Sequence, residues 1–108
     1  MATHQQLIFC TCPNQSTAEQ LAHALLAEQL IACVNILPSI TSIYYWQGQI
    51  ETSQEVLLLI KAPQAQYRAI ESLLKNQHPY EIPEIIAVAI EQGLPAYLNW
   101  IDSCQPTY

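Results

Sequence analysis

Two cysteines separated by a single residue, Cys10 and Cys12, are among the side chains of this chain best suited to bind a transition metal. In a strand, residues two apart lie on the same face, so both sulfur atoms would point the same way. Thiolates select Cu(I) or Zn(II), and an imidazole such as that of His78 suits Cu(II) or Zn(II). Because cysteine is also among the most frequently buried residues, two small core residues are the alternative. Cys10 and His78 are the candidate metal ligands.

The segment HPYEIPE at 78–84 concentrates polar side chains in an otherwise apolar chain. Its two prolines restrict the backbone and lower the entropy cost of holding one conformation. His78, Tyr80 and Glu84 would then point in fixed directions, as a ligand or metal pocket requires. The alternative is a rigid loop whose polar groups satisfy the backbone and each other.

Lys61 and Trp46 complete the set of candidate ligand-binding residues. Lys61 follows the apolar run 56–60, and a lysine in that position commonly extends its amine to water. A lysine paired with Glu84 or Glu55 in a cleft would instead form an anion site. Trp46 stands next to two tyrosines, and exposed aromatic clusters are typical of protein interfaces, which favours an interface over ligand stacking.

The sequence lacks the usual signatures of enzymes. It contains no G-x-S-x-G, no H-E-x-x-H and only two glycines, Gly48 and Gly93, so a glycine-rich phosphate loop is excluded. We therefore predict a protein that is not an enzyme and uses no organic cofactor. A Cys–His pair, formed by Cys10 or Cys33 with His78, or two converging carboxylates at the cleft would instead favour a hydrolase or other enzyme.

Charge and composition exclude several classes of partner. The net charge is −6 with only three Lys and Arg residues, too few cations to bind nucleic acid or an anionic membrane surface. No apolar run reaches the roughly 18 residues of a membrane span. The start of the chain lacks a secretory signal, so a cytoplasmic location is expected, with the cysteines as free thiols. A length of 108 residues predicts a single domain over 1–108.

The pattern of apolar residues predicts the elements that position these side chains. Ser16 and Glu19 are spaced as a capping box at the start of the first helix, and a long hairpin over 32–62 turns at Gln47-Gly48. Pro38 should mark a bulge or bend in that hairpin. The remaining elements are a strand over 6–12, a helix over 64–77, a strand over 85–90 and a short helix over 96–103. The order β-α-β-β-α-β predicts an α+β, ferredoxin-like fold.

The hairpin is too long for a domain of this size. Each arm has about fourteen residues and spans roughly 45 Å at about 3.3 Å per residue. A compact domain of this length is only about 30–35 Å across. The overhanging arms carry Ile43, Tyr44, Tyr45 and Trp46, and the face of the sheet away from the helices would also be bare. Both arguments predict that further copies of the chain cover these surfaces.

Five blocks of sequence, in this order, resemble one family: TCPN at 11–14, ACVNILPSITSIYYWQGQIE at 32–51, IK at 60–61, HPYEIPEI at 78–85 and YLNWI at 97–101. Together they resemble the CutA divalent-cation tolerance proteins over nearly the whole chain. The resemblance implies a ferredoxin-like fold and a homotrimer similar in architecture to the P-II nitrogen-signalling proteins. It also implies a link to tolerance of copper and other divalent ions, and it places Lys61, Tyr80, Glu84, His78 and Trp46 near a cleft between subunits.

Two hypotheses follow. The first is a trimer that binds a divalent ion, copper foremost, or a small ligand near the cleft between subunits. The second is a P-II-like signalling or scaffold trimer that binds a small anion or a protein through Lys61, Glu84 and Tyr80.

Overall fold

The computed structural model describes residues 4–103 and confirms the predicted order of elements. The predicted helix over 64–77 divides into a short 3-10 helix and α2. The elements are β1 (Gln5–Cys12), α1 (Gln15–Ala27), β2 (Cys33–Trp46), β3 (Gln49–Pro63), the 3-10 helix η1 (Gln64–Gln66), α2 (Tyr67–Gln77), β4 (Ile85–Ala89) and α3 (Pro95–Ser103).

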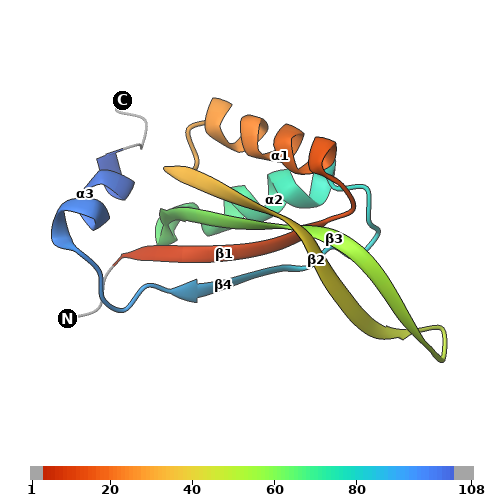
Figure 1. Ribbon diagram of the computed structural model, residues 1–108. Helices are drawn as coiled ribbons and strands as arrows, with labels where there is room; N and C mark the ends of the chain where they lie inside the picture. The colour runs from red at the N-terminus through yellow and green to blue at the C-terminus, as the bar shows by residue number, and fades with distance from the viewer. Residues whose placement is uncertain (1–3, 104–108) are drawn as a thin grey trace.

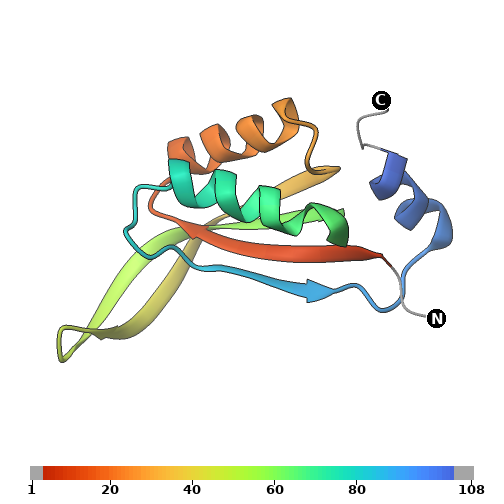
Figure 2. The same ribbon diagram turned by 180° about the vertical axis from the view of Figure 1, so that it is seen from behind.

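The four strands form one antiparallel sheet in the order β2-β3-β1-β4. Helices α1 and α2 lie side by side on one face of this sheet, and α3 lies beyond one end of it (Figures 1 and 2). This is the predicted α+β, ferredoxin-like arrangement. Within residues 4–103, no helix is both long and apolar enough to cross a membrane.

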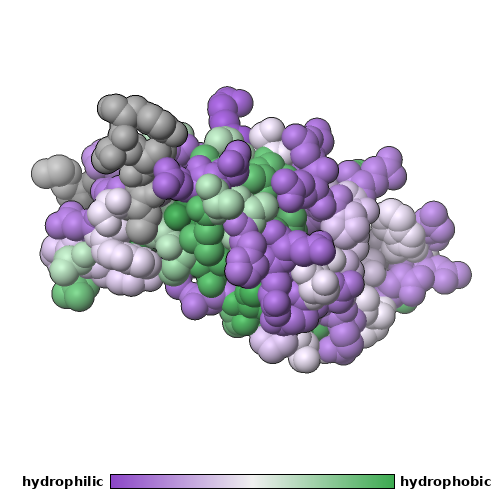
Figure 3. All heavy atoms as spheres, turned by 90° about the horizontal axis from the view of Figure 1, so that it is seen from above, coloured by the Kyte–Doolittle hydropathy of each residue, from purple (hydrophilic) through white to green (hydrophobic). Residues whose placement is uncertain are grey.

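The core lies between the sheet and the two helices. Alternate residues of the central strands, such as Ile8 and Ile60, point toward the helices and are fully buried. Leu25 of α1 and the pair Ile70 and Leu74 of α2 meet them. Viewed from above, the helical layer is largely hydrophilic, and hydrophobic side chains gather between this layer and α3 (Figure 3). Each helix therefore buries its apolar face against the sheet and presents its polar face to solvent.

The first helix does not begin at the predicted capping box. Asn14 is the N-cap, and its side-chain oxygen accepts a hydrogen bond from the Thr17 amide at 2.8 Å. Ser16 lies inside the first turn, and Glu19 accepts from the side chain of Gln15 at 3.0 Å. Asparagine caps helices at least as well as serine. The helix therefore begins after Asn14, which comes first in the chain, and Ser16 falls inside it.

The long hairpin has the predicted turn and the predicted irregularity. Gln47 and Gly48 both have positive φ, 51° and 79°, which matches the two-residue turn favoured by strongly twisted hairpins. The register between β2 and β3 shifts between Leu37 and Ile40, around Pro38. The ladder tolerates Pro38 there because a bulge requires no hydrogen-bond donor.

Beyond this bulge the hairpin leaves the body of the domain (Figure 1). The folded chain measures 46 × 27 × 22 Å, and the projecting arms contribute to its longest dimension (Figure 1). The apolar side chains at the tip are largely exposed: Ile43 by 68%, Tyr45 by 74%, Trp46 by 59% and Ile50 by 65%.

The second face of the sheet has no helix over it. Cross-strand partners share a face, and Phe9 pairs with both Leu59 and Ile86. In the same way Leu7 pairs with Val88. Ile86 and Val88 are more than half exposed. We call these residues, together with Leu57, the open face, and it forms a continuous apolar surface across three strands.

Candidate metal and ligand sites

The structure brings Cys10, Cys12 and His78 together. One potential ligand atom from each of these residues lies within 4.8 Å of the other two. Both cysteines are fully buried and His78 is only 7% exposed. The two proposed ligands, Cys10 and His78, are therefore neighbours, and Cys12 joins them as a third. Two sulfur atoms and an imidazole form a donor set suited to Cu(I) or Zn(II).

Three local features position this cluster. Cys10 and Cys12 alternate with Thr11 along β1 and so both face the helices. Helix α2 ends above this part of the strand, where the His78 amide donates to the carbonyl of Leu74 at 2.8 Å. Pro79 follows, and the residue before a proline avoids the helical conformation, so the chain leaves the helix at His78.

Both ring nitrogens of His78 have backbone partners. Nε2 lies 2.7 Å from the carbonyl oxygen of Thr11, and Nδ1 lies 3.1 Å from the amide nitrogen of Tyr80. A carbonyl can only accept and an amide N–H can only donate. His78 is therefore the neutral tautomer with its proton on Nε2, which donates to Thr11, while Nδ1 accepts from Tyr80.

The two thiols are unequal. The hydrogen bond between them, and then burial, raises the pKa of the Cys10 thiol far above its ordinary value. The same hydrogen bond lowers the pKa of Cys12, although burial and Glu55 oppose this effect. Cys10 therefore keeps its proton, and its Sγ donates to the carbonyl of Thr11 at 3.9 Å, whereas Cys12 is the sulfur with the greater thiolate character.

A cleft of about 890 Å³ opens next to the cluster, between the hairpin and the 79–84 segment. Three aromatic side chains line it, those of Tyr44, Trp46 and Tyr80. Three carboxylates line it as well, those of Glu55, Glu81 and Glu84. The predicted residues Trp46, Tyr80 and Glu84 therefore share one cleft.

Tyr80 connects the cleft to the cluster. Its ring lies 4.7 Å from the imidazole of His78, centroid to centroid. Its hydroxyl donates to Glu55 of β3 at 2.7 Å. Burial, followed by this hydrogen bond to a carboxylate, raises the pKa of the Tyr80 phenol, so it stays protonated as the donor.

Lys61 is not a member of this group. Its strand register places it opposite Leu7 and Cys33, on the open face. Its amine donates to the side-chain oxygen of Asn35, rather than to Glu55 or Glu84, the two expected partners. Glu55 is six residues away along β3, about 20 Å at roughly 3.3 Å per residue. Within this chain, Lys61 therefore lies apart from the cleft.

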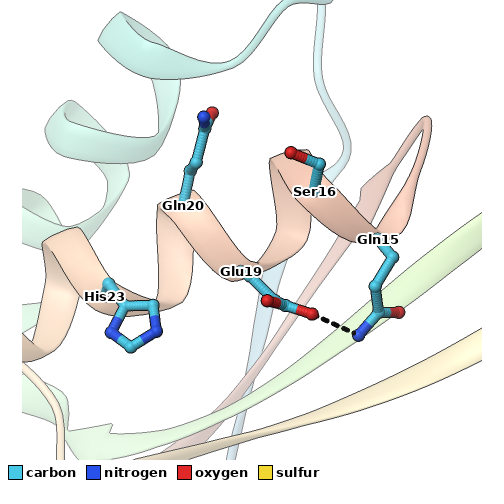
Figure 4. Close-up of a pocket in the computed structure, with 5 residues that line it drawn as sticks. All are labelled: Gln15, Ser16, Glu19, Gln20 and His23. Carbon is cyan, nitrogen blue, oxygen red and sulfur yellow. Dashed lines mark hydrogen bonds between the residues drawn. The ribbon is translucent and has the colours of Figure 1, made fainter.

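A second, shallower depression of about 700 Å³ lies on α1 and is lined by Gln15, Ser16, Glu19, Gln20 and His23. Figure 4 shows these side chains projecting from a single helix, with a hydrogen bond between Gln15 and Glu19. No second element closes the depression among the lining residues, so it is a solvated helix surface.

Sequence reasoning did not place two residues in the sites. The C-x-C spacing places Cys12 on the same strand face as Cys10, and this alternation is the signal that indicates Cys12 as a further ligand. Glu55 was named only as a partner for Lys61. Cys33 lies elsewhere, with its sulfur 3.7 Å from the hydroxyl of Tyr97, and Cys104 falls outside the described residues.

The fold and the cluster together define a class: a small ferredoxin-like protein with an extended hairpin and a buried thiol and imidazole group. Comparison of the sequence with known families agrees with this class. The chain belongs to the CutA1 divalent ion tolerance protein family, whose model matches residues 6–104.

Curated relatives carry the same family name. Protein CutA of Mus musculus is 46% identical over 86% of this chain and 52% of its own length. The divalent-cation tolerance protein CutA of Citrobacter koseri is 38% identical over 90% of this chain and 84% of its own length. The chain thus spans about half the length of the mouse relative and most of the bacterial one.

Solved structures of the family confirm the fold. CutA from Xylella fastidiosa superimposes with a TM-score of 0.93 at 45% identity, covering 96% of this chain and 100% of the other. The divalent cation tolerance protein of Thermus thermophilus gives 0.91 at 39% identity, covering 94% and 99%.

Proposed function

We propose that this chain is a CutA-type metal-responsive protein that binds a divalent ion, copper foremost, at Cys10, Cys12 and His78. It is a binding protein rather than an enzyme and acts in the cytoplasm, where thiols stay reduced. Membership of a family described by divalent ion tolerance supports a relation to metal ions.

The observation that carries the proposal is the buried cluster of three donor atoms from two separate elements. Buried thiols that serve only as core residues need no imidazole beside them. Nε2 of His78 donates to the carbonyl of Thr11, as metal-binding histidines commonly donate their second ring N–H to a backbone carbonyl. Among divalent ions the soft sulfur atoms favour Zn(II), and they bind copper best as monovalent Cu(I), the form that it takes under reducing conditions.

Calorimetric titration of the reduced protein with Cu(I) and with Zn²⁺ tests the proposal. We expect His78→Gln to weaken binding at least tenfold, since loss of even an outer-shell partner costs about 10–100-fold. His23→Gln is the matched control, because His23 lies exposed on α1. Equal affinities of the wild type and His78→Gln would remove His78 from the site.

We also propose that the functional unit is a homotrimer. Two separate apolar surfaces need a cover, the open face and the hairpin tip. Exposed apolar surfaces of this extent mark interaction sites. The extended hairpin can reach a neighbouring subunit while the sheets pack together, and a neighbour's Lys61 can then reach the cleft.

A P-II-like signalling or scaffold trimer is the second candidate, and the cleft is the observation that favours it. A cavity with aromatic walls and a few polar groups is the usual form of a ligand site. Its lining carboxylates disfavour the small anion expected from the sequence and favour a protein segment with donor groups. Ligand that co-purifies in the cleft, with negligible metal affinity, would support this candidate over the first.

A further inference from the structure

Both ring nitrogens of His78 make backbone hydrogen bonds in this structure, so metal binding by His78 must break at least one of them. A neutral imidazole has one lone pair available on a ring nitrogen, and its other nitrogen carries the proton. In the structure this lone pair, on Nδ1, accepts from the amide of Tyr80. A metal bound through Nδ1 would take the lone pair from that amide.

Binding through Nε2 leads to the same result. Nε2 now carries the proton and donates to the carbonyl of Thr11. If Nε2 supplied the lone pair, the proton would move to Nδ1. Two donors, Nδ1–H and the Tyr80 N–H, would then face each other at a heavy-atom distance of 3.1 Å. Whichever nitrogen binds, the Tyr80 amide loses its acceptor.

We infer that metal binding at His78 and the Tyr80-to-His78 hydrogen bond are mutually exclusive, so that metal binding releases Tyr80 and alters the adjacent cleft. This inference rests on the proposed metal-binding function and extends it to the regulation of the cleft. The turn over residues 78–80 would have two conformations, one with the Tyr80-to-His78 hydrogen bond and one without it.

The contacts of Tyr80 carry the change into the cleft. The part-buried Tyr80 amide then lacks its acceptor in the protein, which favours movement of the turn toward a new one. The Tyr80 side chain moves with its backbone, and this strains the 2.7 Å hydrogen bond from its hydroxyl to Glu55. Both residues line the cleft beside Trp46. Metal occupancy therefore changes the wall of the cleft.

The coupling is reciprocal. A ligand or partner that stabilises the Tyr80–Glu55 contact would weaken the binding of metal. Bound metal would weaken the binding of that ligand or partner by the same factor. The arrangement thus supplies a way for a small protein to report metal binding to a partner at its surface.

Amide hydrogen exchange with Cd²⁺ as the probe metal tests the inference in the complete protein. We expect the Tyr80 amide to exchange faster with Cd²⁺ bound, whereas core amides of β1 and α2 exchange more slowly because a ligand stabilises the fold. Bound Cd²⁺ with unchanged or slower exchange at Tyr80 would overturn the inference and leave the proposed function intact. No binding of Cd²⁺ would overturn both.

Tyr80→Phe tests the connection to Glu55. This variant keeps the ring and the backbone amide and removes only the hydroxyl. We expect Cd²⁺ to bind about tenfold more tightly, since a hydrogen bond to a charged group is lost only from the metal-free state. Tyr45→Phe, at the exposed hairpin tip, is the control and should bind as the wild type does. Equal affinity of Tyr80→Phe and the wild type would disconnect the cleft from the metal.

Discussion

Cys10 and Cys12 differ in chemistry although they occupy equivalent positions on one strand. The hydrogen bond between the two sulfur atoms raises the pKa of Cys10 and lowers that of Cys12. A metal binds the thiolate, not the thiol. The proton held by Cys10 is therefore the one that metal binding must displace.

The affinity for Zn²⁺ should consequently rise with pH. Because the pKa of Cys10 is raised, its thiol is protonated throughout the neutral range, and raising the pH favours the form that binds metal. We expect release of at least the Cys10 proton to give a gain in affinity of about tenfold or more per pH unit. Calorimetry between pH 6.5 and 8.5, in buffers of different ionisation enthalpy, measures both the affinity for Zn²⁺ and the number of protons released on binding.

Cys33→Ser is the control for this titration, since Cys33 lies beside Tyr97 and not in the cluster. It should keep the slope of the wild type. An affinity that does not change with pH would contradict the assignment of the proton to Cys10.

At the scale of the elements, the start of α1 illustrates how tertiary context selects among good capping residues. Asn14 comes directly after the proline that follows β1 and has an extended backbone, with φ of −158° and ψ of 171°. That conformation suits an N-cap, whose side chain must reach back to the first turn. Ser16, two residues later, is already helical.

Asn14→Ala should therefore destabilise the protein by about 1 kcal/mol, the usual cost of removing an N-cap side chain. Ser16→Ala is a close control on the same helix and should change the stability by less than about 0.5 kcal/mol. Urea denaturation of both variants measures the two values. A larger effect at Ser16 than at Asn14 would restore the capping box as the start of the helix.

At the scale of the whole molecule, the single chain leaves two apolar regions without cover. The open face spans β4, β1 and β3, and the hairpin tip projects beyond the body of the domain. The open face lies on the side of the sheet opposite the helices, and the hairpin tip lies beyond the end of the domain. They are well separated, and a closed ring of subunits can cover both.

Val88→Asp should dissociate the proposed trimer, because burying an unpaired carboxylate between subunits is strongly unfavourable. We expect sedimentation at low micromolar concentration to show smaller species than the wild type. Leu26→Asp is the control, since Leu26 is 43% exposed on the helical side. An unchanged sedimentation profile for Val88→Asp would exclude the open face as an interface.

Trp46→Ala tests the hairpin tip separately. We expect it to weaken the assembly more than the fold of the subunit, because Trp46 is 59% exposed in the subunit and adds little to its core. Sedimentation and thermal unfolding, measured on the same sample over a range of concentrations, separate the two effects. Loss of stability without any loss of assembly would contradict the interface role.

The sequence by itself determined the elements and their order. Alternating apolar residues, helical spacing, the Gln47-Gly48 turn and the position of Pro38 are local signals, and each acts within a few residues. The overhang of the hairpin also followed from chain length alone, because a strand has a fixed rise per residue.

Only the tertiary structure decided which side chains meet. Thr11 and His78 are 67 residues apart in sequence, and their contact depends on how α2 stacks over β1. The register of β3 placed Lys61 on the open face and Glu55 at the cleft. Local periodicity fixes the face on which a residue lies, whereas its neighbours depend on strand register and layer packing, which are set by the whole core.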